Sequence, residues 1–224
     1  MVTTGNQARA TKSPQNTPTS HVLAIDCKSL NVPNLITLLR LVLAFVLFVM
    51  IYVEALWISA AVVFVAAACT DALDGCIARR YGMVTVLGRV LDPFVDKIII
   101  CGSFIFLLNK NIDFGSGMAL TSGVNEWMVI IIIGREMFVN SLRAFLEQHG
   151  RDFSATLSGK IKMVTQCIAV TVGLLSLSPD IGGQYPKFNV LRDVLLWTAV
   201  AVTAYSGVTY SYRAFVMLRA ESQA

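Results

Sequence analysis

Charged side chains are scarce in this sequence of 224 residues: Asp, Glu, Lys and Arg make up 14% of it, whereas 55% of the residues are hydrophobic. Soluble domains usually carry about 25% charged residues, so the shortage argues against a soluble globular protein. The mean hydropathy of +0.66 and the long apolar runs instead favour a polytopic membrane protein, in which one bundle of helices forms the single domain.

Histidine and paired cysteines are also in short supply. The two histidines, His21 and His149, stand far apart, and the five cysteines form no CxxC pair or other metal-ligand spacing. The sequence therefore offers no zinc site, and we expect no disulfide framework, because cysteines in apolar segments usually act as small hydrophobic residues. The basic residues stand at the ends of apolar runs, which gives little support to nucleic-acid binding.

The N-terminal stretch MVTTGNQARATKSPQNTPTSHV lacks an apolar core. It cannot bury enough apolar surface to fold alone, it does not resemble a signal peptide, and it has no glycine after Met1 for myristoylation. We expect residues 1–30 to be a disordered juxtamembrane tail, residues 31–216 to form one six-helix domain, and residues 217–224 to be a short C-terminal tail.

Six apolar stretches are long enough to cross a bilayer, whose core of about 30 Å needs roughly 20 mostly apolar residues per helix. The segments NIDFGSGMALTSG and SPDIGGQYPKF between them are rich in Gly, Ser and Pro and read as loops. The expected fold class is therefore all-α, with six transmembrane helices. Their approximate limits are 34–53, 55–79, 88–109, 124–145, 159–177 and 189–216.

Lysine and arginine are distributed unequally between the two ends of these predicted spans. Twelve lie on the side that holds both termini and the loop between the second and third spans, and three, Lys110, Lys187 and Arg192, lie on the other. Basic residues concentrate in cytoplasmic loops. The pattern predicts a multi-pass protein of the inner (cytoplasmic) membrane, with both termini and an active-site cavity facing the cytoplasm.

Four aspartates flank that loop, in the stretch DALDGCIARRYGMVTVLGRVLDPFVDK. Asp71 and Asp74 lie near the end of the second span, and Asp92 and Asp96 near the start of the third. Residues three or four apart share a helix face, so two antiparallel helices would bring the four carboxylates together. Clustered anions repel unless a cation holds them, and all-oxygen ligands suit Mg²⁺ or Mn²⁺. The pattern predicts two divalent ions clamping a phosphoryl group.

Two other interpretations of the aspartates stay open at this point. They could form structural ion pairs with Arg79, Arg80, Arg89 and Lys97, or they could belong to an ion or proton pathway. A pathway would place acids through the depth of the membrane, whereas these crowd at one face. A non-catalytic, ion-binding carrier is therefore the alternative from a different functional class.

The same stretch resembles a family signature. Its residues reproduce the spacing DxxDGxxARx(8)GxxxDxxxD at Asp71, Asp74, Gly75, Ala78, Arg79, Gly88, Asp92 and Asp96. This pattern is similar to the signature of the CDP-alcohol phosphotransferases, membrane enzymes of phospholipid synthesis. NVPNLITLLRLVL, GREMFVNSLRAFLEQHG and SGKIKMVTQ resemble segments of the phosphatidylglycerophosphate synthase branch. The resemblance covers roughly residues 31–215.

The resemblance implies transfer of the phosphatidyl group from CDP-diacylglycerol to an alcohol, with CMP as the leaving group. For this branch the alcohol is sn-glycerol 3-phosphate and the product is phosphatidylglycerophosphate. It also implies a homodimer in the lipid bilayer and a divalent-metal site. The nearest alternative keeps the chemistry and changes the acceptor to inositol phosphate, or to phosphatidylglycerol as in a cardiolipin synthase.

The resemblance also assigns roles to individual residues. Asp71, Asp74, Asp92 and Asp96 become metal ligands, and Asp92 and Asp96 are the catalytic pair, with Asp96 as the base that takes the proton of the glycerol 1-hydroxyl. For Asn34 and Thr37, helix capping or packing is the alternative to nucleotide contact. The full set expected at the CDP group is Asn34, Thr37, Asp71, Asp74, Gly75, Ala78, Arg79 and Gly88.

A phosphorylated acceptor requires a second basic cluster, for which Arg135, Arg143, Lys160 and Lys162 are the candidates. For the last three, the alternative is ordinary positive-inside topology or contact with lipid headgroups. Arg135 lies deeper, and it could instead pair with Glu136 or an aspartate. Glu136 and Arg143 are seven residues apart and nearly eclipsed on a helix, which would allow a buried orienting pair.

Overall fold

The computed structural model describes residues 32–54, 56–81, 86–113, 119–148 and 157–221. For residues 32–34, 71–81 and 86–93, the description covers the backbone alone. The predicted N-terminal tail therefore lies outside the described residues, and so do the side chains of Asn34, Asp71, Asp74 and Asp92.

The described chain is mostly helical, which confirms the expected all-α character. Each predicted span coincides with one helix, although the last helix begins three residues earlier than predicted and continues past residue 216. The helices are α1 (Val32–Val53), α2 (Trp57–Tyr81), α3 (Val86–Leu107), α4 (Glu126–Gln148), α5 (Leu157–Ser176) and α6 (Pro186–Glu221).

Among the described residues, two segments are long and apolar enough to cross a membrane, Leu35–Val53 in α1 and Lys187–Met217 in α6. Large apolar side chains are exposed on both apolar helices, for example Phe45 at 61% and Val208 at 69%. Soluble monomers rarely expose extended apolar surface, so these helices indicate a membrane protein; six membrane crossings stay a prediction.

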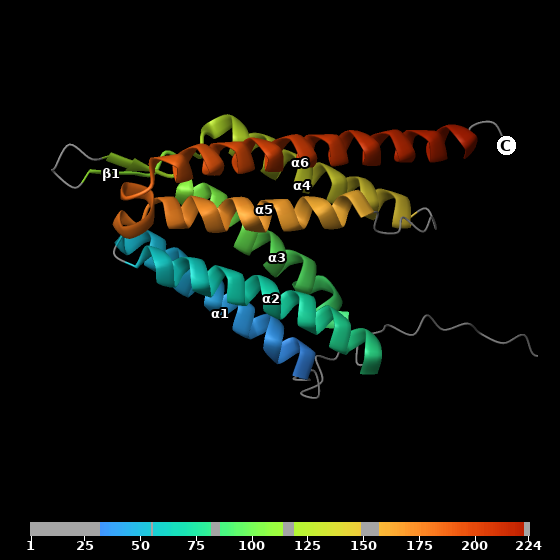
Figure 1. The fold of residues 1–224 in the computed structure, drawn as a ribbon. Coiled ribbons are helices and arrows are strands. Elements are labelled where there is room, and N and C mark those ends of the chain that lie inside the picture. Colours follow the sequence, from blue (N-terminus) through green and yellow to red (C-terminus); the bar gives the residue numbers. More distant parts are fainter. Residues whose placement is uncertain (1–31, 55, 82–85, 114–118, 149–156, 222–224) are drawn as a thin grey trace, which may run out of the picture.

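The chain reverses direction at each connection between helices (Figure 1). α4 and α5 each pack against α6, and these three helices form one group. α1 and α2 pack against each other and form a second group. α3 contacts helices of both groups and lies between them. As a result, the end of α2 and the starts of α1 and α3 lie at one end of the bundle, with the end of α4 and the start of α5 (Figure 1). This arrangement brings the helix ends that carry the predicted aspartates and the predicted basic residues to the same side.

The opposite end of the bundle carries a short antiparallel hairpin, β1 (Asn111–Asp113) and β2 (Ala119–Thr121), with Asn111 opposite Thr121. A π-helical turn, η2 (Pro179–Gly183), precedes α6. Both segments were predicted to be loops. Arg192 of α6 stabilises the hairpin because its Nη1 donates to the Thr121 carbonyl oxygen at 2.5 Å. Gly123, at φ +71°, leaves room for this arginine, since a Cβ there would lie 2.6 Å from its Nε.

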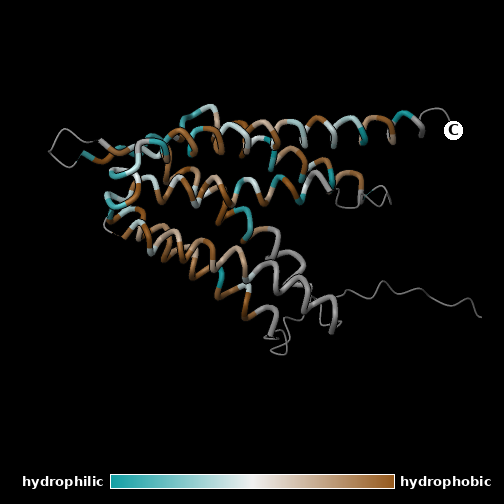
Figure 2. Tube along the Cα trace, in the orientation of Figure 1, coloured by the Kyte–Doolittle hydropathy of each residue, from teal (hydrophilic) through white to brown (hydrophobic). Residues whose placement is uncertain are grey.

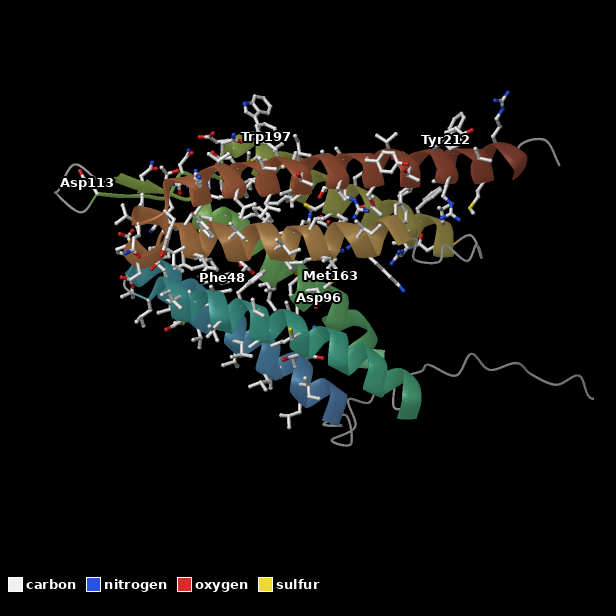
Figure 3. All side chains as sticks on the ribbon, in the orientation of Figure 1. Phe48, Asp96, Asp113, Met163, Trp197 and Tyr212 are labelled. Atoms are coloured by element: carbon white, nitrogen blue, oxygen red, sulfur yellow. The ribbon has the colours of Figure 1, made fainter. Side chains whose placement is uncertain are left out.

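The core of the bundle consists mainly of aliphatic side chains and alanine, and α1 and α3 approach each other closely beside it. The rings of Phe48 and Phe106 stack with their centroids 4.9 Å apart, and a Cβ at Gly102 would lie 2.3 Å from the Phe48 ring. Hydrophobic residues follow much of α1, and hydrophilic residues are frequent near the hairpin (Figure 2). Trp197 and Tyr212 project outward from α6, whereas Asp96 and Met163 lie inside the bundle (Figure 3).

Candidate active site

A cavity of about 280 Å³ lies between α3, α4, α5 and α6. Ligand pockets typically measure about 300–1,000 Å³, so this cavity suits a small molecule. Its wall contains Asp96 together with all four basic residues predicted at the acceptor site. Its polar and titratable lining residues are Asp96, Lys97, Cys101, Arg135, Glu136, Asn140, Arg143, Lys160, Lys162, Gln166 and Tyr210.

A buried ion cluster forms one side of this cavity. The Glu136 carboxylate accepts a hydrogen bond from Lys162 Nζ, and its Oε1 lies 3.4 Å from Arg135 Nη1. All three residues lie deep in the bundle, where an unpaired charge would be strongly destabilising. Because two cations share one carboxylate, the cluster carries an excess of positive charge.

Arg135 is also fixed by α6. Its Nη2 donates to Ser206 Oγ at 2.7 Å, and its guanidinium carbon lies 5.4 Å from the centroid of the Tyr210 ring. A Cβ at Gly207 would lie 3.0 Å from Arg135 Cγ, so α6 approaches this side chain closely. Arg135 therefore joins α4 to α6 as well as lining the cavity.

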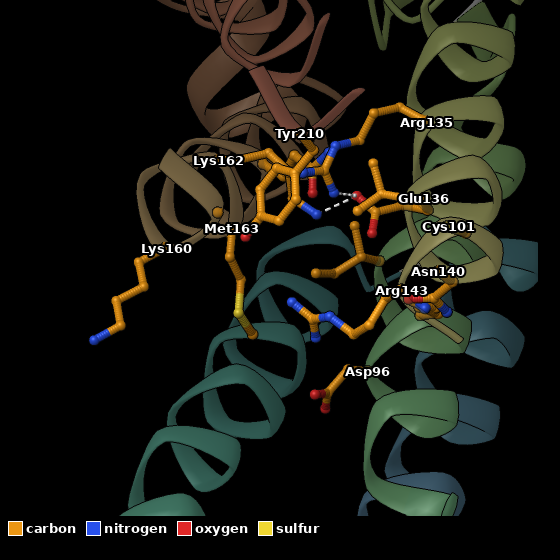
Figure 4. A pocket seen from close by; sticks show the side chains of 15 residues that line it. Asp96, Cys101, Arg135, Glu136, Asn140, Arg143, Lys160, Lys162, Met163 and Tyr210 are labelled. Atoms are coloured by element: carbon orange, nitrogen blue, oxygen red, sulfur yellow. Dashed lines mark hydrogen bonds and ion pairs between the residues drawn. The ribbon is translucent and has the colours of Figure 1, made fainter. Parts of the chain in front are cut away.

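Arg135 pairs with Glu136, one of the two partners offered as the alternative to phosphate binding, whereas the suggested pair between Glu136 and Arg143 is wrong. Glu136 binds Lys162 and Arg135 instead. Seven residues place Arg143 on the same helix face, but they also separate it from Glu136 by about 10.5 Å along the axis. Figure 4 shows the Arg143 guanidinium in the space between the Glu136 cluster and Asp96.

Three basic side chains at this cavity have a buried nitrogen without an acceptor in the part of the chain that the structure describes, and these nitrogens are Arg135 Nε, Lys97 Nζ and Arg143 Nε. Arg135 is held by Glu136 and Ser206 through its other nitrogens, which leaves Lys97 and Arg143 as the pair that makes no hydrogen bond to the described residues. Buried polar groups normally have a partner, so this pair is suited to an anionic ligand. Lys160 differs, because it is exposed and its side chain extends away from the other labelled residues (Figure 4).

Lys97 also lines the cavity, and the sequence did not predict it as a residue of the acceptor site. The sequence offered it as an ion-pair partner for the aspartates, whereas Asp96 pairs with Arg40. Arg40 Nη1 donates to Asp96 Oδ1 at 2.6 Å. Arg40 is 1% exposed, and the Asp96 side chain is 27% exposed. Asp96 lines the main cavity and also a smaller one between α2, α3 and α5.

The other predicted nucleotide and metal residues lie on α1, α2 and α3. Thr37 is buried in α1, one turn before Arg40. Within the described residues no group of three or more His, Cys, Asp or Glu is placed to hold a metal ion. Three of the four predicted aspartates, Asp71, Asp74 and Asp92, are not among the described side chains. Only the backbone is described at Asn34, Asp71, Asp74, Gly75, Ala78, Arg79, Gly88 and Asp92.

The four predicted aspartates nevertheless have the chemistry that a hard divalent cation requires. Asp71 and Asp74 lie in the last part of α2, Asp92 and Asp96 lie in α3, and the two helices contact each other. All four donors are carboxylates, the ligands that Mg²⁺ and Mn²⁺ prefer. The one described member, Asp96, is partly exposed to the cavities on either side of it.

The chain is similar to known proteins over most of its length, including the helices that form the cavity. Residues 30–205 match the family described as CDP-alcohol phosphatidyltransferase. A Bacillus subtilis CDP-diacylglycerol–glycerol-3-phosphate 3-phosphatidyltransferase is 32% identical over 194 residues, covering 80% of this chain and 93% of that protein. A similarly named Arabidopsis thaliana protein is 33% identical over 208 residues, covering 88% and 84%. A probable phosphatidylglycerophosphate synthase of Mycobacterium tuberculosis is 30% identical over 189 residues, covering 82% and 81%.

Proposed function

Since the chain belongs to the CDP-alcohol phosphatidyltransferase family, we propose that it transfers the phosphatidyl group of CDP-diacylglycerol to sn-glycerol 3-phosphate. The products are phosphatidylglycerophosphate and CMP. The observation that carries this proposal is the cavity that places the Asp96 carboxylate beside an excess of basic side chains. The names of the relatives support glycerol 3-phosphate as the acceptor.

In this proposal, Asp96 is the general base. Its carboxylate accepts the proton of the glycerol 1-hydroxyl as that oxygen bonds to the β-phosphorus of CDP-diacylglycerol. The bond between the β-phosphorus and the bridging oxygen breaks, and CMP leaves with that oxygen. A positioned base contributes about 10²–10⁴-fold to the rate of such a step. Asp96 suits this role because it lines the cavity and is partly exposed.

Members of this family use divalent metal ions, and we assign Asp71, Asp74, Asp92 and Asp96 to hold two ions, Mg²⁺ or Mn²⁺. When bound, such ions neutralise the diphosphate and stabilise the departing CMP. Asn34, Thr37, Gly75, Ala78, Arg79 and Gly88 remain the predicted contacts of the CDP group.

The acceptor phosphate is bound, in this proposal, by the basic groups of the cavity. Lys97 and Arg143 have hydrogen-bond donors without an acceptor, and charge-assisted hydrogen bonds to phosphate are among the stronger ones. Lys162 and Arg135 add positive charge while Glu136 holds them in place. Lys160, which points away, contributes mainly to the potential at the entrance.

This arrangement also ranks the alternatives. A basic cavity favours a phosphorylated alcohol, so inositol phosphate is the nearest competing acceptor. Phosphatidylglycerol, which would present a neutral terminal hydroxyl, makes less use of these cations. A carrier that only binds ions would not need an anion site beside the aspartates.

The membrane arrangement is part of the proposal. The concentration of Lys and Arg on one side supports a multi-pass protein of the inner membrane, with both termini and the cavity at the cytoplasmic face. The resemblance to the family supports a homodimer.

The test uses purified protein in detergent with CDP-diacylglycerol, Mg²⁺ or Mn²⁺, and one acceptor per reaction. CMP release is followed, and the lipid product is identified by mass. We expect phosphatidylglycerophosphate with glycerol 3-phosphate, and no transfer by the Asp96→Asn variant, which should still bind CMP. Turnover only with another alcohol would refute the acceptor, normal turnover of Asp96→Asn would refute the base, and no CMP release with any acceptor would favour the carrier.

A further inference from the structure

Arg40 lies in an unusual place for a charged residue. It stands about 12 Å along α1 from the start of that helix, inside one of the two helix segments apolar enough to cross a membrane. A central arginine costs about 2.5–3.5 kcal/mol on membrane-insertion scales. Its side chain is 1% exposed and bonds to Asp96 of α3, so the ion pair joins two helices at the proposed catalytic carboxylate.

In the proposed function, Asp96 has two roles, metal ligand and general base, and these roles place conflicting requirements on the position of its carboxylate. As a metal ligand, its carboxylate is drawn towards a divalent cation and away from the acceptor hydroxyl. As a base, it must keep an oxygen within reach of the acceptor hydroxyl. A guanidinium is always charged and holds carboxylates in a fixed, planar geometry. Arg40 Nη1 donates to Oδ1 of this carboxylate at 2.6 Å.

We propose that Arg40 is a positioning residue that restrains Asp96, so that this carboxylate cannot turn fully onto the metal ions and stays available as the base. The inference rests on the proposed function and deepens it. Outer partners of metal ligands commonly set ligand orientation, and their loss typically changes affinity or activity by about 10–100-fold. Arg40 differs from the usual neutral or anionic partner because its positive charge competes with the metal for the same carboxylate.

Arg192 is a buried arginine with a structural role, and its contacts differ from those of Arg40. Arg192, also buried, lies towards the opposite end of the bundle. Its donors go to the Thr121 carbonyl oxygen and to its own neighbour Asp193, and it fixes the hairpin to α6. Arg40 instead contacts the carboxylate assigned as the base, from a separate helix. Arg192 therefore supplies the matched control.

The experiment compares Arg40→Met, Arg40→Lys and Arg192→Met with the wild-type protein. CMP release gives kcat and the KM of each substrate, and Mn²⁺ alone is titrated by electron paramagnetic resonance. In Arg40→Met, we expect kcat to fall about 100-fold, as for a misplaced base. Both KM values should stay within about twofold, and Mn²⁺ should bind about threefold more tightly, because a competing cation is gone. Arg40→Lys should recover part of kcat, since its charge remains without the planar geometry.

Arg192→Met should lower the thermal midpoint and leave kcat per folded molecule unchanged. A wild-type kcat in Arg40→Met would overturn the proposal, and so would Mn²⁺ affinity that falls together with kcat. If Arg40→Met does not fold, Arg40→Lys is judged by the same two criteria. A wild-type protein that releases no CMP with any acceptor would instead refute the proposed function, and the role of Arg40 with it.

Discussion

Replacing Lys97 by methionine should make the protein more stable and the enzyme worse. The Lys97 amine is buried and makes no hydrogen bond within the described residues. A buried polar group without a partner costs about 1–3 kcal/mol, and methionine fills an irregular space of similar length without a polar atom. We therefore expect Lys97→Met to raise the thermal midpoint of unfolding, measured in detergent without substrate.

The same substitution should weaken binding of the acceptor phosphate. A hydrogen bond to a charged group contributes about 1.5–3 kcal/mol, and each 1.4 kcal/mol corresponds to about tenfold in affinity. The KM for glycerol 3-phosphate should therefore rise by about 10–150-fold, while the KM for CDP-diacylglycerol stays within about twofold. The opposite signs of the two effects separate a ligand-binding lysine from one that only supports the fold.

Lys162→Met provides the comparison. This substitution should raise the same KM but lower the thermal midpoint, because it leaves buried Glu136 with Arg135 alone. Lys187→Met, at an exposed position near the hairpin end, should change neither quantity. The reasoning would be refuted if Lys97→Met lowered the midpoint, or if its KM for glycerol 3-phosphate equalled that of the wild-type protein.

Three further outcomes are expected. Glu136→Gln leaves two buried cations without their carboxylate and should destabilise the protein by about 3–5 kcal/mol, seen as a lower midpoint in detergent; an unchanged midpoint would mean that the cluster is not buried as described. EDTA should abolish CMP release, and added Mg²⁺ or Mn²⁺ should restore it, whereas turnover in EDTA would contradict the metal assignment. Removal of the residues before Ser29 should keep turnover within about twofold, and its loss would assign the tail a role in catalysis.

The six helices were predictable because each is a mostly apolar stretch of about 20 residues or more, although among the described residues only segments of α1 and α6 are apolar enough over their length to cross a membrane. Their ends were less so. Hydropathy predicted that the last span stops at 216, whereas α6 continues to Glu221. A helix stops where its backbone hydrogen bonding stops, and a segment that contains charged residues, such as Arg219 and Glu221, can continue it. Apolar runs therefore mark the part of a helix suited to lipid and do not fix where the helix ends.

The hairpin was missed for a different reason. Its strands are three residues long, too short for an alternating pattern to be recognised among Gly and Ser. Arg192 stabilises the second strand from α6, far away in the sequence. A contact of this kind depends on how the helices pack, which local composition does not report.

The basic residues at the cavity were found from the sequence because a phosphorylated acceptor requires cations and few cations occur within the spans. Their individual roles were not found. Arg135 and Lys162 already share Glu136, although Arg135 Nε has no acceptor, whereas Lys97 and Arg143 make no hydrogen bond to the described residues. The sequence gives the number of charges near this depth, but which cations neutralise the carboxylate depends on the direction of each side chain across three helices.

The pairing of Arg40 with Asp96 was predictable from the depth of the two residues in the bundle. α1 and α3 start at the same end of the bundle (Figure 1), and Arg40 and Asp96 lie about 12 and 15 Å from those starts. Matching depths would therefore have paired them, since a charged residue inside an apolar span requires a partner. The same count fails for Glu136 and Lys162, which lie about 18 and 8 Å from the adjacent ends of α4 and α5. Those ends do not coincide in depth, so this ion pair, and with it one wall of the cavity, follows only from the packed structure.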